Sequence, residues 1–234
     1  MDRTVVIGDI HGRDTWKDIV LKEEFSKLVF VGDYFDSRSD ITPEKIMNNF
    51  LDIMEYKNKN KDSVITLIGN HDLHYLITEK YSGYNSVFSF QYNRLLLDNI
   101  NNLQACYIQD NIIFSHAGLS KTWCKNNEID MSNLEQSVND LFKYKPYSFG
   151  FTGRNPYGDN ITQGPMWIRP MSLLSDKLYN YTQIVGHTED DTIKEKSGVW
   201  FIDNLEKGGY LVIEDKNFSI NNLNNAKIKK QKRT

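Results

Sequence analysis

Five short apolar segments of the chain each end on a polar residue that is able to bind a metal ion. They cover residues 5–9, 28–33, 64–70, 112–116 and 184–187. Four of the five place glycine directly before the final polar residue, and glycine allows the close backbone approach that a crowded site requires. Such runs are typical of buried strands, whose carboxyl ends carry the active sites of open α/β sheets. A solvated turn explains any single run more simply, but five runs of one form favour a common site.

Amphipathic segments alternate with the first three predicted strands. In residues 14–25, Trp16, Ile19 and Val20 recur at helical spacing. A second helix is expected over residues 42–57, because Thr42 and Pro43 are a typical N-cap and first-turn pair. Strands and helices that alternate at this pace predict βαβ units and a mainly parallel first sheet.

The pattern is looser after residue 80. Residues 81–102 contain a Gly-Tyr-Asn loop and a helix-like segment, which we interpret as an insertion that forms one wall of a cleft. A hairpin is expected at residues 105–108 and 112–114, and a helix over about residues 131–144. Residues 145–164 have no clear period and predict a long loop near the site, a candidate lid. Short strands in the last third, including 198–202 and 209–213, predict a second, mostly antiparallel sheet packed on the first.

Composition restricts the class of protein. With 234 residues, 39% of them hydrophobic and 25% charged, the chain is typical of a globular protein, and we expect one domain over residues 1–226. Its apolar runs are far shorter than the roughly 20 residues of a membrane span, so no membrane partner is expected. The first residues lack a signal-peptide pattern, and Cys106 and Cys124 form no C-x-x-C pair. We therefore expect a cytoplasmic, monomeric protein with reduced thiols.

Charge is distributed unevenly along the chain. The formal net charge is −3, although residues 227–234 contain five lysines and arginines, so the rest of the chain is more acidic than the whole. An electropositive groove is therefore not favoured. We expect residues 227–234 to be a basic, disordered tail rather than an arm that binds nucleic acid, which is a less favoured partner.

The strand-end residues form a set of oxygen and imidazole ligands without cysteine. The set consists of Asp9, His11, Asp33, Asn70, His116 and His187. These ligands suit Mn²⁺, Fe or Zn²⁺ better than an all-oxygen calcium site or a thiolate zinc site. Six ligands exceed the needs of one tetrahedral metal, so we predict two divalent ions about 3.5–4 Å apart that share a carboxylate. Asp33 is the predicted bridge, and Mn²⁺ is the favoured metal, with Fe, Zn²⁺ and Ni²⁺ as alternatives.

One histidine is placed to donate a proton rather than to bind metal. His71 directly follows the predicted ligand Asn70, so its ring can face the site without a metal bond. Asp36 would orient this ring and favour its protonated form. We therefore predict that His71 is the general acid for the leaving oxygen. The last histidine, His74, is expected either at the surface or behind the site.

Five motifs in fixed order give the chain a family resemblance. They are Gly-Asp-x-His-Gly, Gly-Asp-x-x-Asp, Gly-Asn-His-Asp, Ser-His-Ala-Gly and Gly-His-Thr. The chain resembles the calcineurin-like metallophosphoesterases, and within them the phosphoprotein phosphatase branch with its small bacterial and phage serine/threonine phosphatases and the diadenosine tetraphosphatases. This resemblance implies a four-layer α/β/β/α sandwich, in which helices flank two mixed sheets.

The resemblance also implies roles for the site residues. One metal would be held by Asp9, His11 and Asp33, and the second by Asp33, Asn70, His116 and His187. Asp36 and His71 would form the proton-donating pair.

The phosphate-binding arginines are less regular than the ligands. The family usually has Asp-Arg-Gly where this chain has Asp36-Ser37-Arg38, so the arginine is displaced by one position, and either Arg38 or Arg13 would bind phosphate. The segment Met166-Trp-Ile-Arg-Pro170 is similar to a Trp-x-Arg segment of the small bacterial members, which makes Arg169 a bidentate phosphate clamp. Arg154 is a weaker candidate.

The sequence thus predicts a dimetal phosphomonoesterase that uses a metal-bridging hydroxide, with a phosphoprotein or nucleotide as its substrate. A serine/threonine-type monoesterase is favoured. The alternative is a diadenosine polyphosphate, cyclic-nucleotide or RNA-end phosphoesterase, suggested by the basic tail and by Asp72, which replaces the Glu of many protein phosphatases. An alternative of another class is a non-catalytic scaffold, although no motif position is missing.

Overall fold

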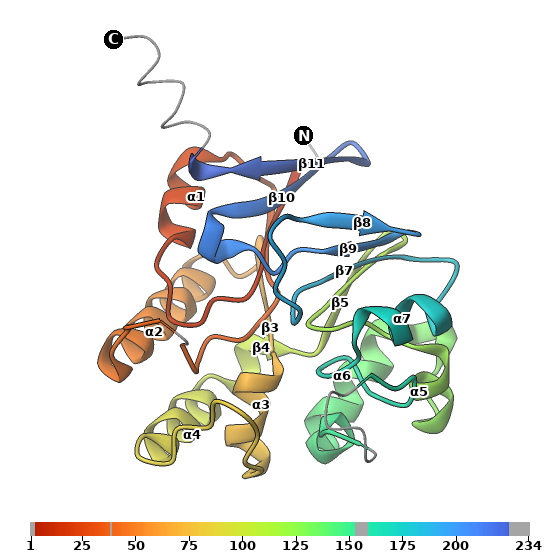
Figure 1. Ribbon diagram of the computed structural model, residues 1–234, viewed down its shortest axis with the longest axis horizontal. Helices are drawn as coiled ribbons and strands as arrows, with labels where there is room; N and C mark the ends of the chain where they lie inside the picture. Colours follow the sequence, from red (N-terminus) through yellow and green to blue (C-terminus); the bar gives the residue numbers. More distant parts are fainter. Residues whose placement is uncertain (1–2, 38, 153–158, 225–234) are drawn as a thin grey trace, which may run out of the picture.

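The computed structural model describes residues 3–37, 39–152 and 159–224, which form two β-sheets with helices around them (Figure 1). In this part of the chain the strand order is β11-β10-β1-β2-β3-β4 in the first sheet and β5-β6-β7-β9-β8 in the second. The strands of the first sheet are β1 (Arg3–Ile7), β2 (Lys27–Phe30), β3 (Val64–Leu67), β4 (Leu103–Gln104), β10 (Gly209–Glu214) and β11 (Asn217–Asn222). Those of the second are β5 (Cys106–Gln109), β6 (Ile112–Ser115), β7 (Thr182–Val185), β8 (Lys194–Lys196) and β9 (Val199–Phe201).

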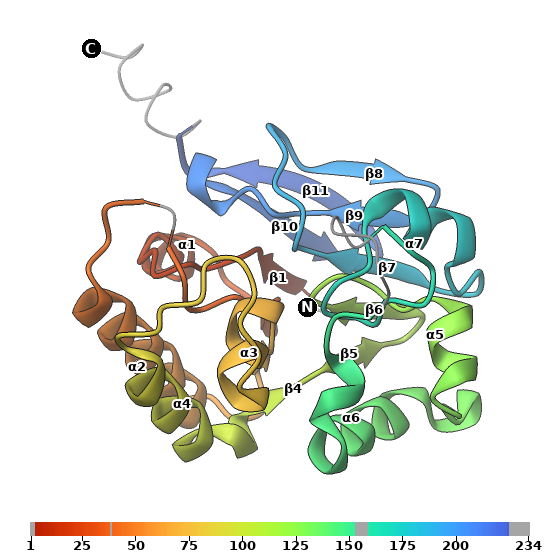
Figure 2. The same ribbon diagram turned by 60° about the horizontal axis from the view of Figure 1, so that its bottom comes forward.

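Helices lie on both outer sides of the paired sheets (Figure 2). On the side of the first sheet are α1 (Trp16–Lys22), α2 (Pro43–Lys59) and α4 (Ser89–Asp98), and on the side of the second are α5 (Lys121–Asn126), α6 (Leu134–Tyr144) and α7 (Pro170–Asp176). Helix α3 (Asn70–Ile77) contributes side chains to the apolar clusters of both sides. Short 3-10 helices are η1 (Ile100–Asn102), η2 (Met131–Asn133), η3 (Pro146–Phe149) and η4 (Leu205–Lys207).

The alternation of side chains along β1 explains the layers. Val5 and Ile7 pack outward into a cluster with Trp16 of α1, whereas Val6 points the other way and joins Phe114 of the second sheet in the cluster between the sheets. The predicted four-layer α/β/β/α sandwich of two mixed sheets is therefore confirmed.

The predicted division of strands between the sheets is partly wrong. Strand β10, expected in the second sheet, pairs with β1 in antiparallel orientation and makes the first sheet mixed. The second sheet is not mostly antiparallel, because β6, β7 and β9 are parallel and only β5 and β8 run against them. The short connection from β9 to β10 carries the chain across from one sheet to the other, and no local sequence pattern reports such a crossing.

Helix positions agree with the sequence better than helix lengths. The helix expected over residues 42–57 is α2, whose Thr42 hydroxyl accepts a hydrogen bond from the Lys45 N–H at 3.4 Å as the predicted N-cap. Of the helix expected over residues 14–25, only Trp16–Lys22 is helical, as α1. The helix expected over residues 131–144 starts as the 3-10 helix η2 and continues as α6. No helix within the described ranges is long and apolar enough to cross a membrane.

Residues 81–102 do not form the predicted wall of the cleft. Helix α4 packs on α3, and its Tyr92 ring lies 4.6 Å from Phe35 in the apolar core. The turn at Gly83 lies against the His71 ring, and Tyr81 and Tyr84 pack around His74. Three further predictions lie wholly or partly outside the described residues: the basic tail, Arg38 with Arg154, and the candidate lid at residues 145–164, of which 153–158 are not described.

Candidate metal centre

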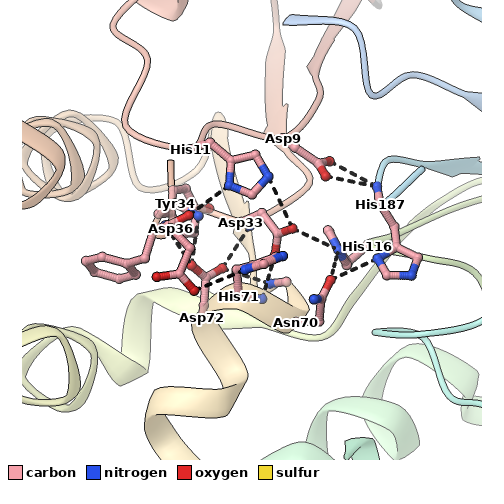
Figure 3. Close-up of polar contacts among 12 residues, drawn as sticks. Asp9, His11, Asp33, Tyr34, Asp36, Asn70, His71, Asp72, His116 and His187 are labelled. Atoms are coloured by element: carbon pink, nitrogen blue, oxygen red, sulfur yellow. Dashed lines mark hydrogen bonds and ion pairs between the residues drawn. The ribbon is translucent and has the colours of Figure 1, made fainter. Parts of the chain in front are cut away.

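Parallel strands bring the predicted ligands to one edge of the sandwich. Asp9, Asp33 and Asn70 follow β1, β2 and β3, which are parallel neighbours in the first sheet. His116 and His187 follow β6 and β7, which are parallel neighbours in the second. Because parallel strands end at the same edge, residues more than a hundred positions apart meet there (Figure 3).

Distances show how closely these six residues approach one another. His11 Nε2 and His116 Nε2 lie 3.6 Å and 3.4 Å from the same atom, Asp33 Oδ2. His116 Nε2 and His187 Nδ1 each lie 2.8 Å from Asn70 Oδ1. Asp9 completes the set, since both of its carboxylate oxygens lie 3.1 Å from the His187 backbone N–H, which donates to them. Asp33 thus lies between the two groups of ligands, where the sequence placed the bridge.

The hydrogen bonds of two histidines show that these residues fit a cation. His11 Nδ1 and His116 Nδ1 lie 2.8 Å and 3.0 Å from the carbonyl oxygens of Phe35 and Val31, which only accept. In a neutral ring the other nitrogen, Nε2, is then a bare acceptor. His116 Nε2 nevertheless faces the oxygens of Asp33 and Asn70, which are acceptors too. A metal ion between them resolves this arrangement, as in sites where the second nitrogen of a ligand histidine is bound to a carbonyl.

Burial keeps the ligand histidines in the neutral form that binds metals. It lowers the pKa of His11 to about 4, against the opposing effect of the Asp33 charge. Burial likewise lowers the pKa of His116, and it lowers that of His187 far below the usual value. His187 Nε2 is also buried without a hydrogen-bond partner among the described residues.

The two carboxylates of the site, Asp9 and Asp33, have pKa values shifted in opposite directions. Burial, together with the charges of Asp203 and Asp33, raises the pKa of Asp9 well above its ordinary value. Burial acts on Asp33 in the same direction, but the neighbouring imidazoles of His116, His71 and His11 hold its pKa low. Divalent cations would stabilise both carboxylates in their ionised form, so the charge of the site also fits a metal centre.

Tight backbone packing explains the glycines that precede the ligands. A β-carbon on Gly69 would collide with the Asp33 carboxylate, and one on Gly186 would collide with that of Asp9. Several ligands also have left-handed backbone angles, with φ of 45° at His11, 54° at Asp33 and 65° at His187. Such angles cost energy and persist where the surrounding structure imposes them, which is common at functional sites.

Asp72 holds the loop that carries Asp33, a role that the sequence did not reveal. Its two carboxylate oxygens accept backbone N–H groups of Asp33, Tyr34 and Gly69 at 2.9, 2.7 and 2.9 Å, and the side chain is fully buried. The residue therefore shapes the ligand loop from within the protein. Its identity as aspartate carries no information about the substrate.

Replacement of Asp72 by asparagine is expected to destabilise the fold by about 2–3 kcal/mol, because the amide NH₂ would face buried N–H donors. Urea unfolding in the presence of a chelator measures this without a contribution from metal binding. Asp98→Asn is the control, since its exposed pair with Arg94 (3.1 Å) should contribute less than about 0.5 kcal/mol. Equal losses in the two variants would contradict the role assigned to Asp72.

His71 and Asp36 lie together beside the metal ligands, as the sequence predicted. His71 Nδ1 is 3.0 Å from Asp36 Oδ2, and since a carboxylate only accepts, this ring nitrogen carries the proton. Burial lowers the pKa of His71, but the charges of Asp33 and Asp36 outweigh it and raise the pKa above its usual value. His71 lines the cleft, so its Nε2 remains for the substrate.

His74 is not at the surface, which was one of its two predicted positions. Its ring is fully buried, and its Nε2 lies 2.6 Å from Asp36 Oδ2, the atom that also contacts His71. A signal in the sequence was available, because residues three and four apart share one face of a helix and His71, His74 and Tyr75 have this spacing.

A cleft of about 400 Å³ opens onto these groups. Its lining includes four of the predicted metal ligands, Asp9, His11, Asp33 and His187, and two of the predicted arginines, Arg13 and Arg169. Arg169 Nη1 donates to the His187 carbonyl oxygen at 3.3 Å and to Thr188 Oγ1 at 3.2 Å. Arg13 Nη2 donates to Glu206 Oε2 at 2.7 Å. Arg38 and Arg154 lie outside the described residues.

Asp203 is a further residue of this cleft that sequence reasoning missed. It follows β9 and forms a hydrogen bond with Asp9, and burial together with the Asp33 charge raises its pKa to about 7. Its segment, Val199-Trp-Phe-Ile-Asp203, is another apolar run that ends on a carboxylate. Ile202, not glycine, precedes Asp203, so the run does not match the Gly-Asp form of the first two.

This fold and site define a class of enzyme, the metal-dependent phosphoesterases. The chain matches the family model of the calcineurin-like phosphoesterases (Metallophos) over residues 2–189, and it belongs to that family. The protein is therefore a phosphatase, a hydrolase of phosphoric esters, with candidate metal-binding groups.

Solved structures show the same fold at low sequence identity. The cold-active protein-tyrosine phosphatase of a Shewanella species is 18% identical, with a TM-score of 0.60 over 95% of this chain and 80% of that one. A protein serine/threonine phosphatase from Saccharomyces cerevisiae is 13% identical, with a TM-score of 0.57 over 94% of this chain and 79% of that one. The comparison with curated proteins gives no match.

Proposed function

We propose that the protein is a dimetal phosphomonoesterase that removes phosphate from phosphoserine, phosphothreonine or a similar monoester in a protein. One observation carries the proposal: bare imidazole nitrogens and carboxylate oxygens converge on Asp33, next to the His71–Asp36 pair, in one cleft. The non-catalytic scaffold is not favoured, because every group that the reaction needs is present.

Two divalent cations fit the ligand set. Asp9, His11 and Asp33 would hold one, and Asp33, Asn70, His116 and His187 would hold the other. When bound, the pair would lower the pKa of a water molecule and neutralise charge on the phosphoryl oxygens. The mixture of imidazole and oxygen ligands favours Mn²⁺, with Fe, Zn²⁺ and Ni²⁺ as alternatives.

The remaining groups of the cleft would bind phosphate and protonate the leaving oxygen. Arg169 is the favoured phosphate-binding residue, because its guanidinium lies at the cleft beside the His187 backbone. Arg13 lines the same cleft but is engaged with Glu206, so we assign it a secondary role. His71 would give the Nε2 proton to the leaving oxygen while Asp36 holds the ring in place.

The cleft favours a phosphorylated protein over a nucleotide. Acidic and basic residues both line it among the described residues, with Glu206 paired to Arg13 and Asp190 to Lys194, so charge does not discriminate between these substrates. That lining contains no Trp, Tyr or Phe on which a nucleobase could stack. Two structures of similar fold are protein phosphatases by their titles, which adds support of a general kind.

A substrate panel with metal-loaded protein tests the proposal. We expect the Mn²⁺-loaded protein to hydrolyse p-nitrophenyl phosphate and phosphoserine or phosphothreonine peptides, to lose this activity with a chelator, and to recover it when Mn²⁺ is returned. Absence of hydrolysis under these conditions would refute the proposal. Faster turnover of dinucleoside polyphosphates, 2′,3′-cyclic nucleotides or RNA ends than of phosphopeptides would instead support the alternative substrate class.

A further inference from the structure

The Asp36 carboxylate is held by more groups than the single contact with His71. His71 Nδ1 and His74 Nε2 both approach Asp36 Oδ2, at 3.0 Å and 2.6 Å. The Tyr75 hydroxyl donates to the other oxygen, Oδ1, and itself accepts the Asn85 backbone N–H at 2.8 Å. Two of these three partners, His74 and Tyr75, have no part in the proposed chemistry.

The three partners come from one face of α3. His71, His74 and Tyr75 are spaced at i, i+3 and i+4, so their side chains project in the same direction from the helix. Asp36 meets them from the loop after β2 and has a left-handed φ of 58°. This part of the loop belongs to no strand or helix, so side-chain contacts must fix the carboxylate.

Burial of the His74 ring is unexplained by packing alone. The ring is fully buried among Tyr75, Tyr81 and Tyr84, with centroid distances of 4.3, 6.3 and 5.1 Å. Apart from the approach of Nε2 to Asp36, neither ring nitrogen has a hydrogen-bond partner among the described residues. Burial of an unpaired polar group is costly, and an apolar residue would fill this space at lower cost. The contact with Asp36 is therefore the distinctive property of His74.

Asp36, His71 and His74 also have the spacing of a metal-binding group. The contacts of 2.6 Å and 3.0 Å are, however, those of hydrogen-bonded or ion-paired partners. Unlike the six-residue candidate metal centre, this group has three members, and Asp36 Oδ1 already accepts the Tyr75 hydroxyl. We therefore interpret the group as a chain of contacts that leads from His74 through Asp36 to His71.

We propose that His74 is a positioning residue which, together with Tyr75, fixes the Asp36 carboxylate so that His71 points its Nε2–H at the leaving oxygen. This inference rests on the proposed function. Fixing His71 matters only when the leaving group needs a proton. The loss of His74 should therefore impair the hydrolysis of alkyl and phenyl phosphates, whose leaving oxygens are strongly basic, and spare p-nitrophenyl phosphate, whose leaving anion is stable.

The experiment compares two substitutions of similar volume in the full-length, Mn²⁺-loaded protein. His74→Leu removes the ring whose Nε2 lies 2.6 Å from Asp36 Oδ2, and His74→Gln supplies an N–H group that can reach Asp36. The ratio of kcat for phenyl phosphate to kcat for p-nitrophenyl phosphate is measured for each variant. We expect this ratio to fall about tenfold or more in His74→Leu and to recover substantially in His74→Gln. General acids contribute roughly 10²–10⁴-fold to the rate, and the loss in His74→Leu should be a part of that contribution.

A control variant separates positioning from packing. Tyr84→Phe alters the aromatic cluster around His74, but Tyr84 does not contact Asp36, so this variant should keep the wild-type ratio. All variants should keep their full metal content. Equal losses on both substrates, an unchanged ratio in His74→Leu, or no difference between Leu and Gln would overturn the inference. Loss of a metal ion in His74→Leu would also overturn it and identify the cluster as a metal site.

Two outcomes remain distinct from these. If His74→Leu does not fold, Tyr75→Phe replaces it, because this change removes the hydroxyl that donates to Asp36 Oδ1. Tyr75→Phe must then lower the ratio of kcat for phenyl phosphate to kcat for p-nitrophenyl phosphate. An unchanged ratio would overturn the inference. Inactivity of the wild-type protein on both substrates would refute the proposed function itself, before any variant is compared.

Discussion

Replacement of Asp33 by asparagine is expected to weaken metal binding by about 100-fold or more and to remove nearly all phosphatase activity. Asp33 Oδ2 lies 3.6 Å from His11 Nε2 and 3.4 Å from His116 Nε2, so one oxygen serves both predicted metal positions. An asparagine offers a neutral oxygen or an NH₂ group at that point and removes the shared negative charge. Metal analysis after dialysis, titration calorimetry with Mn²⁺ and kcat measurements check this result.

The size of the Asp33 effect distinguishes a bridge from a ligand of a single ion. A bridging residue should reduce the content of both metals, whereas replacement of Asn70 should leave one position largely occupied. Asp62→Asn, at an exposed position outside the lining of the cleft, controls for the loss of one carboxylate. Two bound equivalents and normal kcat in Asp33→Asn would exclude the dimetal assignment.

The second large effect is expected from replacement of His71 by alanine. The ring lies at the cleft and is oriented by the 3.0 Å contact of its Nδ1 with Asp36. Its loss should lower kcat for phosphoserine peptides and alkyl phosphates by about 10²–10⁴-fold, the usual contribution of a general acid. Metal content and the unfolding midpoint should change little, because the metal ligands are other residues.

Comparison of substrates makes the His71 prediction specific. The loss of kcat in His71→Ala should be much smaller with p-nitrophenyl phosphate, because its leaving group departs without a proton. With phenyl phosphate, the loss of kcat should be larger in His71→Ala than in His74→Leu. Full activity of His71→Ala on alkyl phosphates would refute the role of general acid. A deficit of equal size on all substrates would point to a role in binding phosphate instead.

The sequence brought the candidate ligands together but misassigned strands between the sheets. Five of the six predicted ligands end an apolar run, and His11 follows two residues after the first of them, so this local rule needs no knowledge of strand order. Assignment of β10 to a sheet depends on a pairing partner, β1, that is about 200 residues away in the chain. Hydrophobic alternation is the same in either sheet, so it does not report which partner is chosen.

Supporting residues escaped sequence analysis for a related reason. Asp72 and His74 lie in a motif that was interpreted through its neighbours Asn70 and His71, and their own contacts reach back to the loop after β2. Asp203 lacks the glycine that precedes the final residue in four of the five predicted runs. Helical spacing does place His71, His74 and Tyr75 on one face, but only the structure shows that Asp36 lies opposite that face.

The sequence by itself predicted the candidate ligands and the proton-donating pair from local patterns of apolar runs, glycines and polar residues, and the family resemblance of its motifs implied the four-layer class that the fold confirms. Tertiary structure alone decided which strands pair, that Asp33 stands between His11 and His116, and that buried residues of α3 hold Asp36 from behind. The physical reason is that these features depend on contacts between segments distant in the chain. Their geometry is set by how the two sheets and α3 pack together, and no short stretch of sequence contains it.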